Sequence, residues 1–255
     1  MYATLVLRFL KFYAQGTNMS TEINALILTA ASMGFFHTIL GPDHYLPFVM
    51  ISWAKKWSGL KTGIITFLCG IGHILSSVVL GLVGVAFGIM VSKLEFIESF
   101  RGNIAAWLFI AFGLVYFVWG LRQAYKNKPH AHSHIHFDHD THNHKHIHHD
   151  EHTHIHAEEK KANITPWVLF IIFVFGPCEP LIPLLMYPAA KSNWSGLIMV
   201  TAVFGLTTIA TMMTLVLVAR SGISFAKLNP LNKFSHAIAG ATICLCGLAI
   251  VFLGL

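Results

Sequence analysis

Six long apolar stretches set the strongest limit on what this chain can fold into. They cover approximately residues 23–53, 62–91, 103–121, 165–189, 195–219 and 235–255. Roughly 20 apolar residues in a helix cross a bilayer core about 30 Å thick, and a helix bonds its own backbone polar groups where no water can. Only 11% of the 255 residues are charged, against roughly 25% in soluble domains. The sequence therefore predicts an all-α integral membrane protein with about six transmembrane helices.

The formal net charge of +6 reflects membrane topology rather than nucleic-acid binding, because Lys and Arg occupy the short gaps between apolar stretches. Twelve of the 17 basic residues fall in the odd-numbered gaps. The excess of basic residues on cytoplasmic loops places those gaps in the cytoplasm and both termini outside. We predict a plasma-membrane or inner-membrane protein with the lipid bilayer as its partner, no nucleic-acid partner and no enzymatic activity. The sequence does not predict its oligomeric state.

A Gly-Pro pair interrupts the first and the fourth apolar stretch. "GPDHYLPF" begins at Gly41 and "GPCEPLIP" at Gly176, and each is followed by Lys and then by Trp-Ser-Gly, at Trp57 and Trp194. Because proline breaks a helix, both stretches are predicted to be discontinuous. Three spans per repeat is an odd number, so the two copies must have opposite orientations. This is the inverted-repeat plan of secondary transporters, whose broken helices meet near the middle of the membrane.

Four segments follow from these patterns. Residues 1–19 are an N-terminal extension, with an interfacial helix as its expected form. Residues 20–125 form the first transmembrane repeat, residues 126–163 a histidine-rich loop, and residues 164–255 the second transmembrane repeat.

Ionisable residues inside apolar spans are functional candidates, because their burial in lipid is costly. Those in the predicted spans are His37, Asp43, His44, His73 and Glu179. Imidazole with carboxylate suits nickel, cobalt, zinc or copper better than magnesium or calcium.

Cys178 follows the second Gly-Pro pair, and three roles remain open for it: metal ligand, redox-active thiol or small apolar filler. An anion site would require Arg or Lys within the spans, and the sequence pattern predicts none there.

The loop between the repeats contains 13 of the 17 histidines. They are His130, His132, His134, His136, His139, His142, His144, His146, His148, His149, His152, His154 and His156. Because so polar a segment cannot form a packed core, we predict that it is disordered when empty. Imidazoles at this density bind transition metals, although a pH-sensing segment or an insert without function would also fit. The topology predicts a cytoplasmic loop that concentrates metal.

His37, the Gly41-Pro42-Asp43-His44 run, the Gly72-His73 pair and the His-rich loop together carry a family resemblance. On these residues the chain resembles the nickel/cobalt transporter superfamily (NicO-like proteins and nickel/cobalt efflux relatives with a His-rich loop), within a wider sulfite-exporter-like group. The pattern of that family places four residues between the His and the Asp-His pair, and this chain has five. The resemblance implies that Asp43 and His44 bind the transported ion.

The sequence therefore predicts a transporter of divalent transition-metal ions, with nickel or cobalt as substrate, zinc or copper less favoured, no cofactor, and export favoured over import. His73, His37, Cys178 and Glu179 would complete the ligand shell. A membrane thiol–disulfide conduit related to cytochrome c maturation is a second hypothesis, because "GPCEPLIP" is similar to the Pro-Cys motif of that family. Each repeat of such a conduit supplies one cysteine, and here Asp43 occupies the first position. A sulfite or organic-anion exporter and a metal-buffering membrane protein without transport are further hypotheses.

Overall fold

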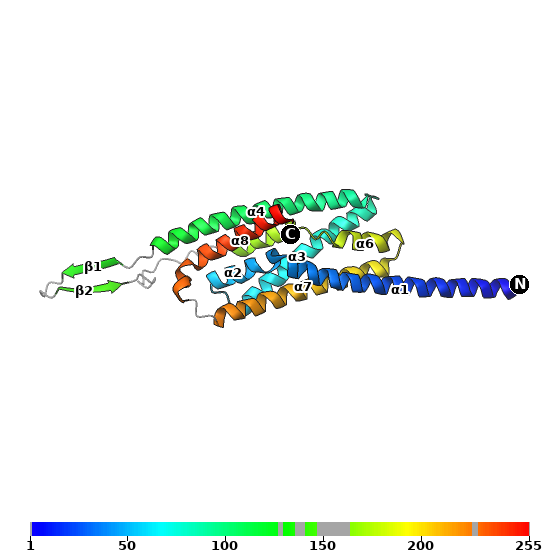
Figure 1. The fold of residues 1–255 in the computed structure, drawn as a ribbon, viewed down its shortest axis with the longest axis horizontal. Helices are drawn as coiled ribbons and strands as arrows, with labels where there is room; N and C mark the ends of the chain where they lie inside the picture. Colours follow the sequence, from blue (N-terminus) through cyan, green and yellow to red (C-terminus); the bar gives the residue numbers. More distant parts are fainter. Residues whose placement is uncertain (1, 127–129, 136–140, 147–163, 226–228, 255) are drawn as a thin grey trace, which may run out of the picture.

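The computed structural model describes the backbone of residues 2–126, 130–135, 141–146, 164–225 and 229–254. Long helices run side by side along the longest dimension of the molecule (Figure 1). In chain order they are α1 (Tyr2–Leu40), α2 (Leu46–Ala54), α3 (Gly59–Ala86), α4 (Val91–Lys126), α5 (Thr165–Phe175), α6 (Leu181–Ala190), α7 (Trp194–Phe225) and α8 (Ser235–Leu253). Short 3₁₀ turns cover Pro42–His44 and Asn229–Phe234.

Five of the described helices contain segments long and apolar enough to cross a membrane: Thr21–Leu40, Gly59–Ala86, Val91–Lys126, Trp194–Ile223 and Leu231–Leu253. This confirms the prediction of a helical integral membrane protein. With 11 and 10 residues, α5 and α6 are each too short to cross alone, since a span needs roughly 17 to 25. Residues 2–19, predicted to be a separate extension, continue into the first span as part of the single 39-residue helix α1.

The helices break at both Gly-Pro pairs, as predicted. After Leu40 the chain passes through Gly41 and the 3₁₀ turn Pro42–His44 before α2 begins. At the second pair, α5 ends at Phe175 and α6 begins at Leu181. Proline has no N–H to donate and its ring clashes with the preceding helical turn, so the local sequence accounts for both breaks.

Glycines bring α4 and α8 into backbone contact along the bundle. A Cβ placed on Gly113 would lie 2.3 Å from the Cys244 nitrogen, and one on Gly240 would lie 2.2 Å from the Phe117 nitrogen. Real Cβ atoms do not approach other atoms that closely. Small residues permit such close approach of helices in lipid, where van der Waals packing drives association. The two helices are antiparallel, since Gly120 meets Ala237 at one end and Gly247 meets Ile110 further along.

Part of the His-rich segment is described as strands rather than as the disordered loop predicted from composition. Strands β1 (His130–Ile135) and β2 (Thr141–His146) pair antiparallel, with His130 opposite His146. The hairpin projects from the end of the bundle where α4 finishes (Figure 1). Composition argues against a packed core, but a hairpin needs only backbone pairing. Residues 136–140 and 147–163, which hold His136, His139, His148, His149, His152, His154 and His156, lie outside the described residues.

Candidate functional site

Three histidines from three different elements meet inside the bundle. His37 lies near the end of α1, His44 ends the 3₁₀ turn after Gly41, and His73 lies in the middle of α3. One nitrogen from each ring lies within 4.8 Å of the others. His44 and His73 are buried and His37 is half-buried. The ring centroids of His37 and His44 are 4.7 Å apart, and those of His44 and His73 are 5.1 Å apart.

The Asp43 carboxylate fixes the orientation of His44. Its Oδ1 lies 3.2 Å from His44 Nδ1, so the ring nitrogen donates to the carboxylate. Gly41 allows this arrangement, because a Cβ there would lie 2.6 Å from His44 Nδ1. With Nδ1–H engaged, Nε2 presents its lone pair to the cluster. A carboxylate that orients a ligating imidazole in this way raises its basicity and is common beside metals. The structure thus places Asp43 behind His44, rather than among the three clustered nitrogens.

His73 is held by the second helix break. Its Nδ1 lies 3.3 Å from the carbonyl oxygen of Phe173. In an unbroken helix that carbonyl would accept from the residue four positions later, which here is Pro177 and has no N–H. The Phe173 carbonyl accepts from the Gly176 N–H at 3.1 Å, and the missing donor at Pro177 leaves its second lone pair for the His73 Nδ1–H. This bond fixes the His73 tautomer and leaves its Nε2 facing the other rings.

The Nε2 atoms of His37, His44 and His73 are all buried without a hydrogen-bond partner. A buried unpaired polar atom costs about 1–3 kcal/mol, and three at one point are unusual in a native protein. A metal ion accepting all three lone pairs would satisfy them together. Three imidazoles with an open fourth position suit zinc, copper and their neighbours. Ligation at about 2.1 Å would require the rings to close up slightly from their described positions.

The other two predicted ligands, Cys178 and Glu179, lie beside this cluster without joining it. Gly176 packs on His73, since a Cβ there would be 3.1 Å from His73 Nδ1. Cys178, two residues later, is fully buried. Glu179 is exposed and lines a neighbouring cavity with His37. The structure therefore brings three of the six predicted residues into one group and positions the other three around it.

Sequence reasoning missed a buried ion pair in α4. Arg101 Nη1 donates to Glu98 Oε1 at 2.8 Å, and the Glu98 side chain is completely buried. Arg101 Nη2 also donates to Ser76 Oγ and to the carbonyl of Val174, both at 2.7 Å. Arg101 thus supports the last turn of α5, next to the break. The apolar pattern assigned Arg101 to a gap between two stretches, whereas in the structure it lies within the continuous 36-residue helix α4.

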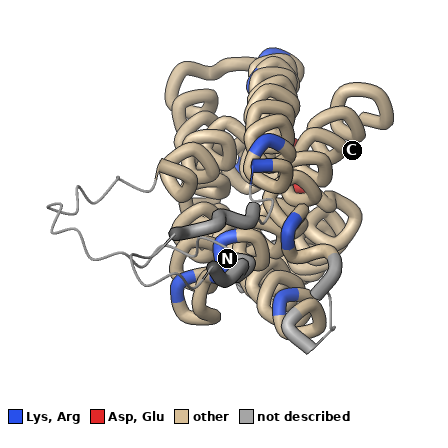
Figure 2. The backbone as a smooth tube through the Cα atoms, turned by 90° about the vertical axis from the view of Figure 1, so that its left-hand side faces the viewer, with Lys and Arg blue, Asp and Glu red and all other residues tan. Residues whose placement is uncertain are grey.

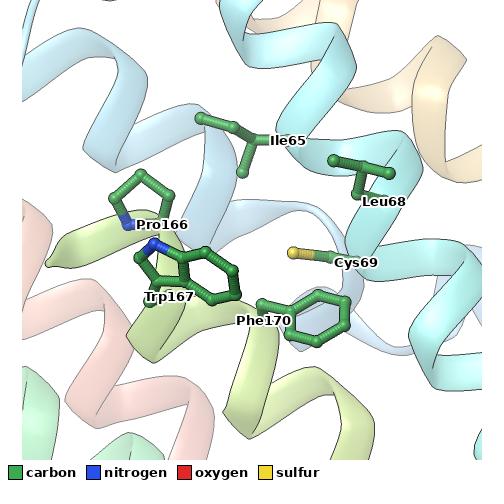
Figure 3. A pocket seen from close by; sticks show the side chains of 6 residues that line it. All are labelled: Ile65, Leu68, Cys69, Pro166, Trp167 and Phe170. Carbon is green, nitrogen blue, oxygen red and sulfur yellow. The ribbon is translucent and has the colours of Figure 1, made fainter. Parts of the chain in front are cut away.

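Cys69 lines a separate cavity between α3 and α5. This cavity has a volume of about 410 Å³ and is lined by Ile65, Leu68, Cys69, Pro166, Trp167 and Phe170. Figure 3 shows the Cys69 sulfur pointing toward the aromatic rings on α5. Cys69 is buried and is not in a disulfide. Its apolar surroundings distinguish this cavity from the polar centre formed by the histidines.

These observations define a polytopic membrane protein whose broken helices meet at a buried polar centre. The chain belongs to the family described as the cytochrome c biogenesis protein transmembrane region, which matches residues 46–255. The matched residues include His73 and the second break with Cys178, and they begin just after His44. No curated protein and no solved structure matches the chain significantly.

The family match corrects the assignment made from the sequence. Membership of the nickel/cobalt transporter superfamily is wrong, and nickel or cobalt transport is no longer the function to be expected. The resemblance depended on short runs of Gly, Pro, Asp and His. Such runs suit any broken intramembrane helix with a polar centre, so they do not discriminate between families. The match favours the thiol–disulfide hypothesis.

Proposed function

We propose that this chain carries reducing equivalents across the membrane by thiol–disulfide exchange, in support of cytochrome c biogenesis. The family description supports the process, and the position of Cys178 supports the residue. Cys178 is fully buried directly after the Gly176-Pro177 break, inside the matched region. Hinge movements are absorbed by a few loop or element-terminal residues, and the residues of this break, between α5 and α6, are of that kind.

Two thiols of this chain, those of Cys178 and Cys69, supply the two electrons and two protons that the exchange requires. The Cys178 thiolate attacks one sulfur of a partner protein's disulfide and forms a mixed disulfide, and the released partner thiolate takes up the proton that Cys178 lost. The Cys69 thiolate then attacks the Cys178 sulfur, which forms an internal disulfide and frees the second partner thiol. Two electrons have passed to the partner. A dithiol donor on the opposite side of the membrane reverses both steps.

The internal disulfide requires movement of the α5–α6 segment. Cys178 lies beside Glu98, which also lies beside Ser77. Ser77 is eight residues beyond Cys69 on α3, about 12 Å of helix rise. A disulfide tolerates at most about 7 Å between Cα atoms. The described arrangement therefore corresponds to the dithiol form, and oxidation would bring the second break toward Cys69.

Trapping the thiols by alkylation tests this proposal. Membranes containing the full chain are treated with a mild disulfide oxidant, quenched with acid, and labelled with a high-mass maleimide. We expect oxidation to protect Cys69 and Cys178 from labelling together, and Cys178→Ser to restore labelling of Cys69. Cys244→Ser, which removes a half-buried thiol on α8, is the control and should leave the pattern unchanged. Full labelling of both thiols in the oxidised wild type would overturn the proposal.

We further propose that His37, His44 and His73 bind a transition-metal ion within the membrane. The three unpartnered Nε2 atoms carry this second proposal. The test uses the full chain with the 13 loop histidines replaced by serine, so that the loop does not contribute. Co²⁺ should give the visible absorption bands of a tetrahedral nitrogen site, and His73→Gln should abolish them. Identical spectra for His73→Gln and its parent would reject the site.

An inverted-repeat plan is also proposed for the bundle. Helix contacts support it, because α3 packs on the broken helix α5 while α7 packs on the broken helix α1, and α4 packs on α8. At the matching depth, His73 contacts Gly176 beside one break, and Thr208 Oγ1 lies next to Gly34 before the other. The pairing makes Asp43 and Cys178 counterparts at the centre. The excess of basic residues in the odd-numbered gaps supports a cytoplasmic position for the His-rich segment.

A further inference from the structure

A polar cavity adjoins the histidine cluster. It has a volume of about 440 Å³ and its lining includes His37, Ser99, Asn103, Pro177, Glu179 and Val251. It lies between α4, the C-terminal end of α8 and the second helix break. We call it the vestibule. Of the three clustered histidines only His37 lines it, while His44 and His73 are buried behind.

The vestibule lies in the half of the bundle away from the hairpin, because Ser99 and Asn103 are in the first half of α4. Helix α8 begins beside the last turns of α4, since Gly120 packs on Ala237. It ends at Leu253, next to Ser99 and Asn103 in the first part of α4. Figure 1 shows the hairpin leaving from the other end, where α4 finishes. The side chains of Ser99, Asn103 and Glu179 are exposed, so the vestibule opens to the surface of the helical bundle.

The charge of the vestibule suits a cation. Among its described lining residues Glu179 is an acid and none is Lys or Arg. The Arg101 guanidinium, which lies near the second break, is engaged by Glu98. In contrast, several basic segments and few acidic ones are visible in the view from the hairpin side (Figure 2). A cleft lined by one sign of charge with apolar walls raises the local concentration of the opposite ion and its association rate.

We propose that the vestibule is the entrance through which a transition-metal cation reaches the three histidines, with the Glu179 carboxylate as the capture group and His37 as the first ligand met. This inference deepens the proposed metal site and depends on it. It assigns Glu179 a role outside the ligand shell. The carboxylate attracts the ion, which then moves on and binds to His37. Asn103 and Ser99 supply oxygens that replace part of the hydration of the ion on the way.

Rates of Co²⁺ association test the entrance separately from the site. The protein is the full chain with the 13 loop histidines replaced by serine, purified in nanodiscs and mixed with Co²⁺ in a stopped-flow absorbance instrument. Glu179→Gln should slow association about 3- to 10-fold at low ionic strength, since steering by clefts spans roughly 10- to 1,000-fold. Its final spectrum should equal that of the parent. Raising the salt concentration should slow the parent and leave Glu179→Gln nearly unchanged, because salt screens the steering charge.

Two further variants test whether the effect on the association rate is specific to the vestibule. Glu95→Gln removes an exposed acid from α4 outside the vestibule and should associate at the parental rate. Val251→Cys, at an apolar lining position of the vestibule, should block the vestibule and slow association further when labelled with a bulky maleimide, while the unlabelled Val251→Cys protein binds normally. Equal Co²⁺ association rates for Glu179→Gln and the parent would overturn the proposal that the vestibule is the entrance. A changed final spectrum in Glu179→Gln would make Glu179 a ligand and would equally overturn it. If the parent binds no Co²⁺ at all, the proposal that the three histidines form a metal site is rejected.

Discussion

Removing Arg101 should destabilise the protein more than any other single charge removal among the described residues. The Arg101→Met variant keeps most of the side-chain length but leaves the Glu98 carboxylate without its partner at complete burial. Breaking a buried pair by removing one partner costs about 3–5 kcal/mol. The Val174 carbonyl would lose its donor as well, and an unsatisfied buried acceptor costs about 1–3 kcal/mol. Because these two losses share one side chain they are not additive, and we expect about 4 kcal/mol in total.

The assay is unfolding in detergent micelles, followed by circular dichroism against rising denaturant. Arg122→Met is the matched control, since Arg122 is exposed on the same helix, and it should shift stability by less than about 0.5 kcal/mol. The double variant Glu98→Gln with Arg101→Met should recover much of the loss, because replacing both charges removes the unpaired one. Wild-type stability in Arg101→Met, or a double variant no better than Arg101→Met, would refute the reasoning.

Three other outcomes follow from the structure. Gly113→Leu should separate α4 from α8 and cost at least about 2 kcal/mol by overpacking, measured in the same unfolding assay, whereas Gly222→Ala, with nothing within 4 Å of the new Cβ, should be neutral or slightly stabilising. Asp43→Asn should weaken Co²⁺ binding about 10- to 100-fold, as loss of an orienting carboxylate does, and an unchanged titration curve would contradict its placement behind His44. Pro177→Ala should restore an N–H that competes for the Phe173 carbonyl, so it should also weaken Co²⁺ binding, and tighter binding than the parent would contradict that bond.

Much of the centre was predictable from spacing. His37 and His44 are seven residues apart, close to two helical turns, and the structure brings them within ring contact. His73 was a candidate because an imidazole inside an apolar run is costly without a role. The contact between His73 and the second break was not predictable. That contact depends on the packing of α3 against α5. The two bonded residues, His73 and Phe173, are 100 residues apart in the sequence.

Arg101 shows why the ion pair was missed. Its neighbours in sequence include Glu98 and the apolar Phe96 and Ile97, a pattern that fits a loop or the end of a span equally well. Only the packing of α4 against α3 and α5 shows that the guanidinium reaches Ser76 and Val174. A hydropathy pattern averages the hydrophobicity of neighbouring residues over a window. The burial of one side chain depends instead on which elements pack against its face of the helix.

The sequence by itself determined the membrane location, the helical class, the two breaks and the identity of the polar residues near them. These are local or compositional properties: apolar length sets the spans, and proline ends a helix wherever it occurs. Tertiary structure alone decided which residues meet. It brought His73 to the pair formed by His37 and His44, left Glu179 at a vestibule, and set Cys69 about two helical turns from the level of Cys178. Those distances arise from helices packing across the bundle, and no local pattern encodes them.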